Sequence, residues 1–181
     1  MNLHPEILLH PNIPKPFHGM APRTVLGSKW WDQTRKECYA AHDYHCFACG
    51  NHQDAVPLMP GRLEGHEFYV VDYKARTVRF IEAVALCHAC HNYIHQGRME
   101  AMVEKGEMKE GKYFAIIEWG DSVLQNAGLE PKIKVDMLDK GDPTEDWSDW
   151  RMIIEGKEYP PRFRTWLEWD MEYNGPPRKR K

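Results

Sequence analysis

Apolar positions change from an irregular to a helical spacing near residue 28. Residues 1–27 hold five prolines and show no periodic pattern, which is typical of an extended arm rather than a helix. From Ser28 onward, large side chains recur at helical spacing as far as Tyr39, and serine is a favoured helix N-cap. We therefore predict a Pro-rich arm over 1–27 and a helix over 29–41 that is capped by Ser28.

Two later stretches have the composition of β-hairpins. Residues 68–72 and 77–81 are apolar β-formers separated by four residues, and His66 lies at the entry of the hairpin that they predict. Residues 150–159 predict a second hairpin that turns at Glu155-Gly156. Residues 50–62 contain prolines and glycines and predict a loop.

Helical spacing returns in three places. One helix is expected to begin near Cys90 and run to Gly106, and a second to cover 113–127 with Gly128 as its stop. A closing aromatic helix is expected at Trp166, Trp169 and Tyr173. The acidic stretch 136–149 predicts a solvated loop.

These elements predict an α+β chain in four segments. The arm 1–27 precedes a compact unit over 28–106, which is followed by a small aromatic-rich α+β extension over 107–174. Residues 175–181 form a basic tail that we expect to be disordered. At 181 residues and 42% hydrophobic content, the chain can bury one core and a second, smaller one.

The charge pattern restricts where a nucleic acid could bind. The net charge is −3; residues 1–100 carry ten basic and ten acidic side chains, and residues 101–177 carry ten basic and seventeen acidic ones. Because phosphate binding requires a basic surface, any such surface must be local. The acidic second half would face away from DNA or toward a protein partner. The best candidates for phosphate contacts are Lys15, Arg23, Lys29, Arg35 and Lys36.

The strongest motif consists of two CxxC pairs, Cys46-Phe-Ala-Cys49 and Cys87-His-Ala-Cys90. Four thiolates at this spacing are what a closed tetrahedral zinc site requires, so we predict a structural zinc ion on these four residues. The sequence contains neither a membrane-spanning stretch nor a signal peptide, and paired CxxC motifs in a reducing compartment are typical of metal sites. We therefore expect a cytoplasmic protein. Cys38, in the first helix, is interpreted as buried packing.

The histidines near this motif are not needed for the zinc site. Singly, each would more often be a packing or surface residue, but His66, His91 and His95 together could converge on one divalent cation. A histidine on the hairpin could then activate water beside Mg²⁺, Mn²⁺, Ni²⁺ or Zn²⁺. His88 and Asn92 are expected to be accessory to this group. His42, His45 and His52 flank the first CxxC pair and could supplement the zinc ligands.

The order of these features resembles the HNH, or ββα-metal, endonucleases with a treble-clef zinc knuckle. A helix with Trp and Arg precedes a CxxC pair, a histidine on a strand and then Leu86-Cys-x-x-Cys-His91 opening a helix. Residues 90–98 are also similar to the metal-binding end of the nuclease domain of DNase colicins, where two histidines four apart hold the ion. The likeness covers about residues 28–100, and the whole chain is similar to uncharacterised phage-type HNH-like proteins.

The resemblance implies a zinc-stapled ββα-metal unit that hydrolyses phosphodiester bonds in DNA. It implies that His66 is the general base and that His91 and His95 bind the catalytic ion. Two positions depart from the family pattern: Gly65 stands where a metal ligand is usual, and Glu82 stands at the place of the middle asparagine.

The departures leave several roles open. Glu67 would become the base if the register shifts by one residue, and Glu64 or Glu67 might supply the missing ligand. The alternative function is a catalytically degenerate zinc module that binds nucleic acid or a partner protein. A zinc deaminase fits poorly because His66 and Glu67 are adjacent rather than one residue apart. Trp147, Trp150, Trp166 and Trp169 are expected to form a core rather than stack on bases.

Overall fold

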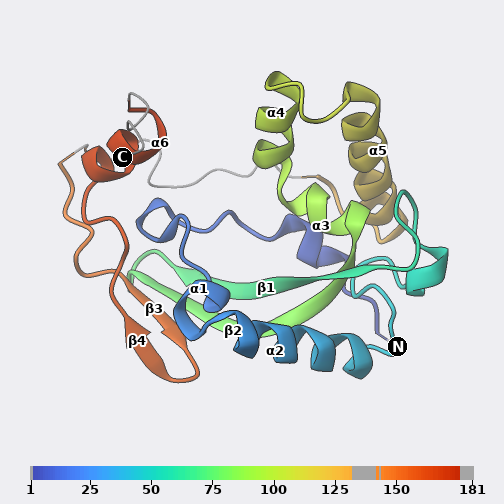
Figure 1. Cartoon of the computed structure of the whole chain (residues 1–181), viewed down its shortest axis with the longest axis horizontal. Helices are drawn as coiled ribbons and strands as arrows, with labels where there is room; N and C mark the ends of the chain where they lie inside the picture. The colour runs from blue at the N-terminus through green and yellow to red at the C-terminus, as the bar shows by residue number, and fades with distance from the viewer. Residues whose placement is uncertain (1, 132–141, 143, 176–181) are drawn as a thin grey trace. The chain divides into compact units, whose positions relative to one another are not determined.

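The computed structural model describes residues 2–131, 142 and 144–175 of an α+β protein (Figure 1). A four-stranded sheet has the order β1-β2-β3-β4, which confirms the predicted α+β class. The chain forms two compact units, each assembled from separate segments. Unit 1 comprises residues 1–10, 28–68 and 82–134, and unit 2 comprises residues 11–27, 69–81 and 135–181.

The arm contains short helices, so the prediction of a purely extended arm was wrong. It forms the 3₁₀ helices η1 (Pro5–Leu9) and η2 (Lys15–Phe17) and the α-helix α1 (Pro22–Leu26). Each has a proline in its first turn, where the missing N–H has no intrahelical partner to lose. The prolines therefore begin these helices instead of preventing them.

Unit 1 contains the first half of β1 and the second half of β2, which belong to the first hairpin. Helix α2 (Ser28–Ala41) ends as predicted at Ala41 but includes Ser28, the expected N-cap, as its first residue. The strands β1 (Leu63–Asp72) and β2 (Thr77–Cys87) confirm the hairpin and are both longer than predicted. A Cβ atom at Gly65 would lie 3.0 Å from Cβ of Arg35 and 3.1 Å from Cζ2 of Trp31, so α2 packs directly on this face of β1 (Figure 1). His66 therefore lies within a strand and not at its entry.

The predicted helix from Cys90 to Gly106 is interrupted, which corrects the expectation of one continuous helix. α3 covers His88–Ile94 and α4 covers Gln96–Glu104. His95 separates them with φ −100° and ψ 43°, a conformation outside the helical region. His91 and His95 consequently do not share one regular helix face.

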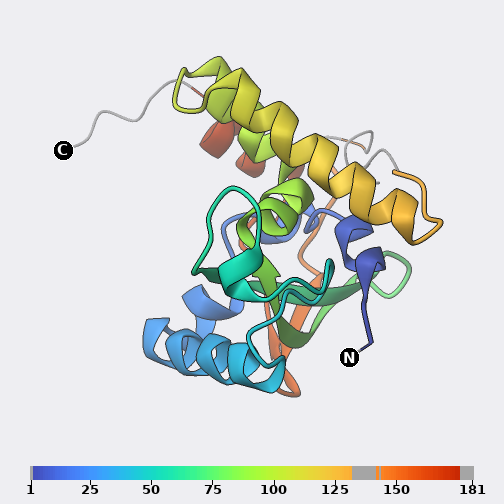
Figure 2. The ribbon, with the colours of Figure 1, turned by 90° about the vertical axis from the view of Figure 1, so that its right-hand side faces the viewer.

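The third helix of this region, α5 (Glu110–Asn126), packs across α3, as Figure 2 shows. Gly120 permits the approach, because a Cβ atom there would lie 2.0 Å from Cδ2 of the buried Tyr93 ring. Tyr93 also donates a hydrogen bond of 2.7 Å from its hydroxyl to Asp121 Oδ1. Gly128, with φ +70°, follows the helix end as predicted.

Unit 2 confirms the second hairpin and the closing helix. β3 (Arg151–Ile154) and β4 (Lys157–Tyr159) are antiparallel, and Glu155 and Gly156 form the turn with φ of 50° and 75°. β3 also pairs in parallel with β2, with Thr77 opposite Arg151. The closing helix is α6 (Trp166–Tyr173).

The core of unit 2 is aromatic, as expected. Trp147 and Trp150 are each 1% exposed, and the half-buried Trp166 and Trp169 pack against the same cluster. Lys15 is buried, with its Nζ 4.7 Å from the centre of the Trp169 ring, so it is not a surface candidate for phosphate binding. This burial corrects the sequence-based assignment of Lys15.

Part of the sequence-based description falls outside the described residues. Of the predicted acidic loop over 136–149, residues 136–141 and 143 lie outside the described part. Residues 142 and 144–149 are described and contain no helix or strand. The expected disorder of the basic tail falls on residues 176–181, which are also outside the described part.

Candidate metal centres

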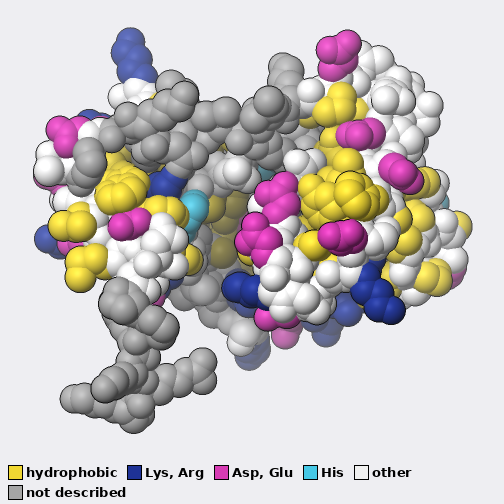
Figure 3. All heavy atoms as spheres, turned by 90° about the horizontal axis from the view of Figure 1, so that it is seen from above, with side chains coloured by type: hydrophobic (Ala, Val, Ile, Leu, Met, Phe, Trp, Pro, Cys, Tyr) yellow, Lys and Arg dark blue, Asp and Glu magenta, His cyan; other side chains and the backbone are white. Residues whose placement is uncertain are grey.

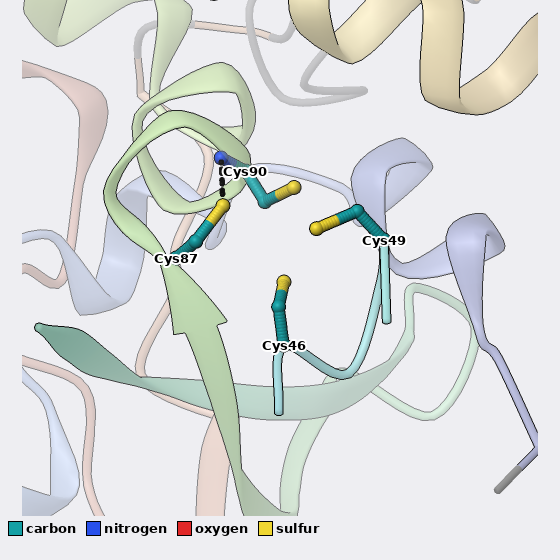
Figure 4. Close-up of side chains that lie close together, drawn as sticks. All are labelled: Cys46, Cys49, Cys87 and Cys90. Atoms are coloured by element: carbon teal, nitrogen blue, oxygen red, sulfur yellow. Dashed lines mark hydrogen bonds between the residues drawn. The ribbon is translucent and has the colours of Figure 1, made fainter. Parts of the chain in front are cut away.

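Four cysteines meet in unit 1 in the arrangement that their spacing predicts. Their sulfur atoms lie within 4.8 Å of one another and point toward a common centre (Figure 4). The sulfurs of a tetrahedral zinc–thiolate site are about 3.8 Å apart, so four sulfurs grouped this closely suit such an ion. Cys46, Cys87 and Cys90 are fully buried and Cys49 is half-buried. This burial is expected for a closed structural site.

Local backbone geometry presents each cysteine pair. In the first pair, Gly50 adopts φ +74° and donates a hydrogen bond of 2.8 Å from its N–H to the Cys46 carbonyl. The loop is attached to the hairpin by a 2.8 Å hydrogen bond from Phe47 N–H to the Ala85 carbonyl. In the second pair, Cys87 is the N-cap of α3, and its sulfur accepts a hydrogen bond from Cys90 N–H.

The four thiols influence one another's ionisation strongly. Hydrogen bonds from Cys49, Cys87 and Cys90 lower the pKa of Cys46 well below its ordinary value. Hydrogen bonding to Cys46 and Cys49 raises the pKa of Cys87 and Cys90. Only a cation can stabilise four adjacent thiolates, and its binding would therefore release protons.

The nearby residues that might have supplemented these cysteines have other contacts. Cys38 is 8% exposed in α2 and lies outside the group, and burial raises the pKa of its thiol to about 12. His42 hydrogen-bonds the Cys38 carbonyl through Nδ1, His45 the Asp43 carbonyl, and His52 the Asp54 N–H. Within the described residues, this metal-ligand group contains only the four cysteines.

A second group combines three histidines from β1 and the α3–α4 junction. One ring nitrogen from each of His66, His91 and His95 lies within 4.8 Å of the others. The His91 and His95 ring centroids are 4.8 Å apart, and those of His66 and His95 are 5.2 Å apart. His66 is 3% exposed, whereas His91 and His95 are half-buried, so the group is open on one side.

Glu64 connects this group to the start of α3. One carboxylate oxygen bonds Nδ1 of His88 at 2.8 Å, and the other bonds Nδ1 of His91. Burial by itself would raise the pKa of Glu64, but the hydrogen bonds to both histidines outweigh it and hold the pKa well below its usual range. An ionised Glu64 keeps the proton of His91 on Nδ1, which leaves the lone pair on Nε2.

Strand alternation explains the position of the acidic residues. Glu64 and His66 are two apart and contact α3 or its end, whereas Gly65, between them, faces α2. A side chain at position 65 would therefore point away from the histidines. Glu67 shares the parity of Gly65 and is outside the histidine group.

Two residues near the histidine group have roles that the sequence did not predict. His10, in the arm, lies with Nδ1 3.3 Å from Nε2 of His66. His88 shares Glu64 with His91, although it was considered only as accessory. No periodicity or motif identifies His10, because its proximity depends on how η1 packs against α3 and α5.

The asparagine position of the HNH pattern also differs in structure. Glu82 is exposed on β2 and acts electrostatically on Cys38 of α2, which raises the pKa of that thiol in addition to the larger effect of burial. Asn92, an amide on α3, is 7% exposed and donates from Nδ2 to the His88 carbonyl at 2.8 Å.

Comparison with known proteins adds no relative. No family model, curated protein or solved structure matches the chain. No helix in the described part of the chain is both long and apolar enough to cross a membrane.

Proposed function

We propose that the protein is an HNH-like, metal-dependent endonuclease that hydrolyses phosphodiester bonds in DNA. The observation that carries this proposal is the grouping of His66, His91 and His95 beside a buried set of four cysteines. Because Cys90 and His91 are neighbours in α3, an ion on the cysteines would also hold the histidine-bearing helix in place.

The donor sets suit two different ions. Four thiolates favour zinc in a closed structural site, whereas imidazoles accept Mn²⁺, Ni²⁺, Zn²⁺ and, more weakly, Mg²⁺. His91 and His95 would hold the second ion, with Glu64 orienting His91 through Nδ1. An ion bound there would neutralise negative charge that develops on the phosphate oxygens.

His66 supplies the general base. Its imidazole takes a proton from a water molecule as the water oxygen forms a new bond to phosphorus. The ester bond from phosphorus to the leaving sugar oxygen breaks, and that oxygen takes a proton from solvent. The products are a phosphate monoester and a free hydroxyl end, and His66 then returns its proton to solvent.

Contacts to the DNA backbone would come from a few exposed cations. Arg98 is exposed on α4, and its N–H donates to the carbonyl of His95, which places its backbone next to the histidine group. Lys29 and Lys36 are exposed on α2, but that helix packs on the other face of β1. Arg35 is paired with Asp32 at 2.9 Å. Arg98 is therefore the first candidate for a phosphate contact.

A non-catalytic zinc module that binds a protein or nucleic acid is the second candidate. The exposed Glu82 at the asparagine position and the net charge of −3 favour it. Acidic side chains also surround exposed hydrophobic ones where α4 and α5 reach the surface (Figure 3). Phe114 of α5 is 56% exposed, and Glu104, Glu107 and Glu110, which are close to it in the sequence, are exposed as well.

Plasmid nicking decides between the two candidates. Purified protein is incubated with supercoiled plasmid and Mg²⁺, Mn²⁺, Ni²⁺ or Zn²⁺, beside His66→Ala and His91→Ala. His52→Ala is the matched control, because His52 is 41% exposed and outside both groups. We expect nicking by the wild type and the control and none by the other two. Absence of nicking with every ion, in folded protein with its zinc, would favour the binding module.

A further inference from the structure

His10 contacts the histidine group from outside the segment that resembles HNH nucleases. Its side chain is 7% exposed, and its Nδ1 lies 3.3 Å from Nε2 of His66. The two rings meet edge to face with centroids 5.3 Å apart. In such a contact, one nitrogen must donate a hydrogen and the other must accept it.

We infer that His10 is a positioning residue that accepts a hydrogen bond from Nε2–H of His66. This bond fixes the tautomer of His66 in which Nδ1 carries the lone pair. If His10 donated instead, the Nε2 lone pair of His66 would be used by that bond, and Nδ1 would carry the proton. His66 could then neither take a proton from water nor ligate an ion, although it lies in a group suited to both.

The fold around His10 holds its ring in one place. Ile7 and Leu8 of η1 are 4% and 0% exposed, and the N–H of His10 donates to the Ile7 carbonyl at 2.9 Å. On its other side, the His10 ring contacts Phe68 of β1 with centroids 5.5 Å apart. The arm therefore carries a functional side chain into unit 1 and is more than a packing segment.

Two substitutions separate hydrogen bonding from packing. His10→Asn keeps an acceptor atom close to the position of Nδ1 but loses the ring. His10→Phe keeps a ring that can pack against Phe68 but has no nitrogen. If His10 positions His66, the Asn variant should nick DNA within about threefold of the wild-type rate. The Phe variant should be slower by about 10- to 100-fold, as for other residues that orient a functional histidine.

The tautomer can be read without any catalytic assay. Long-range proton–nitrogen correlation spectra of the full chain with isotope-labelled histidine report which ring nitrogen is protonated, and His66→Ala assigns the signal. We expect Nε2–H on His66 in the wild type and in His10→Asn, and a mixture of tautomers in His10→Phe. A wild-type His66 with Nδ1–H, or a tautomer unchanged in His10→Phe, would overturn the inference.

The assignment of a catalytic role to His66 rests on the proposed function, and the two measurements separate the claims. A wild type that nicks no DNA, but whose His66 tautomer depends on His10, contradicts the endonuclease and supports the positioning. If the wild type nicks DNA and His10→Phe nicks it equally fast, the positioning role of His10 is contradicted and the proposed endonuclease activity is not.

Discussion

The cysteine group and the histidine group share α3 but depend on different amounts of the fold. The cysteines come from two CxxC pairs, each presented by its own tight local backbone. The histidines come from β1, from α3 and from the break between α3 and α4, with His10 of the arm in contact. The cysteine group forms when two short segments meet. The histidine group depends on the register of β1, on the break between α3 and α4 and on the packing of the arm.

This difference suggests a division of labour within unit 1. The four cysteines can form a rigid anchor that joins the 46–49 loop to the junction of β2 and α3 once a metal binds. The half-buried His91 and His95 are open enough for a substrate or water. Disturbing the anchor should therefore disturb both groups, whereas changes at the histidines should leave the cysteines intact.

The largest expected effect follows from removing an anchor ligand. Structural zinc contributes about 10–16 kcal/mol to the folding of small zinc peptides, so Cys46→Ala should lose the metal and the cooperative unfolding of unit 1. Cys38→Ala is the control, because Cys38 is also a buried cysteine but lies outside the group. Metal analysis and thermal unfolding measure both. A Cys46→Ala protein that unfolds like Cys38→Ala would show that the cysteines carry no structural ion.

The next effect concerns the base. Removing a general base typically slows a reaction by 10²- to 10⁴-fold, so His66→Gln should lower the nicking rate by about that factor. Its zinc content should match that of the wild type, because the cysteine group does not include His66. Rate constants from plasmid nicking give the answer. A nicking rate close to wild type would remove His66 from the mechanism.

Displacing α3 without touching either group tests the anchor more finely. Gly120→Ala forces a Cβ atom against the buried Tyr93 ring, and overpacking of this kind costs about 1–3 kcal/mol of unfolding free energy. Gly111→Ala, in the same helix, meets nothing within 4 Å and should be neutral or stabilising by up to about 1 kcal/mol. Denaturant unfolding compares the two. Equal stability of the two variants would mean that α5 does not support α3 through this contact.

The smallest effect is expected at Glu64. Loss of a carboxylate that orients a metal-binding histidine typically lowers metal affinity by about 10- to 100-fold. Glu64→Gln should therefore weaken Mn²⁺ or Ni²⁺ binding at the histidines while the tightly bound zinc remains. The exposed Glu82 provides the matched Gln control. Calorimetric titration would contradict this role if both variants bound the ion as the wild type does.

Sequence reasoning succeeded where structure is local. The end of α2 at Ala41 and the turn at Glu155-Gly156 follow from helical spacing and turn chemistry, and the two CxxC pairs follow from ligand spacing within each pair. The buried Trp147 and Trp150 were also anticipated from their size and apolar surface. Each of these features is decided mainly by neighbours in the chain.

Sequence reasoning failed where distant segments decide the outcome. The parallel pairing of β2 with β3 joins residues more than 70 positions apart, and neither strand's pattern specifies the partner. The break at His95 interrupts an otherwise helical pattern. The prolines of the arm were interpreted as helix breakers, although they occupy first turns. His10 could not be found because packing alone brings it to His66.

The central claim is that unit 1 holds two separate metal sites, one anchoring the fold and one open for chemistry. The most direct test is to count the ions bound by the wild type and by a His91→Ala/His95→Ala double variant in equilibrium dialysis. We predict two classes of site in the wild type, one tight and one weak, with only the tight class left in the double variant. A single class in the wild type, or loss of both classes together in the double variant, would contradict the account.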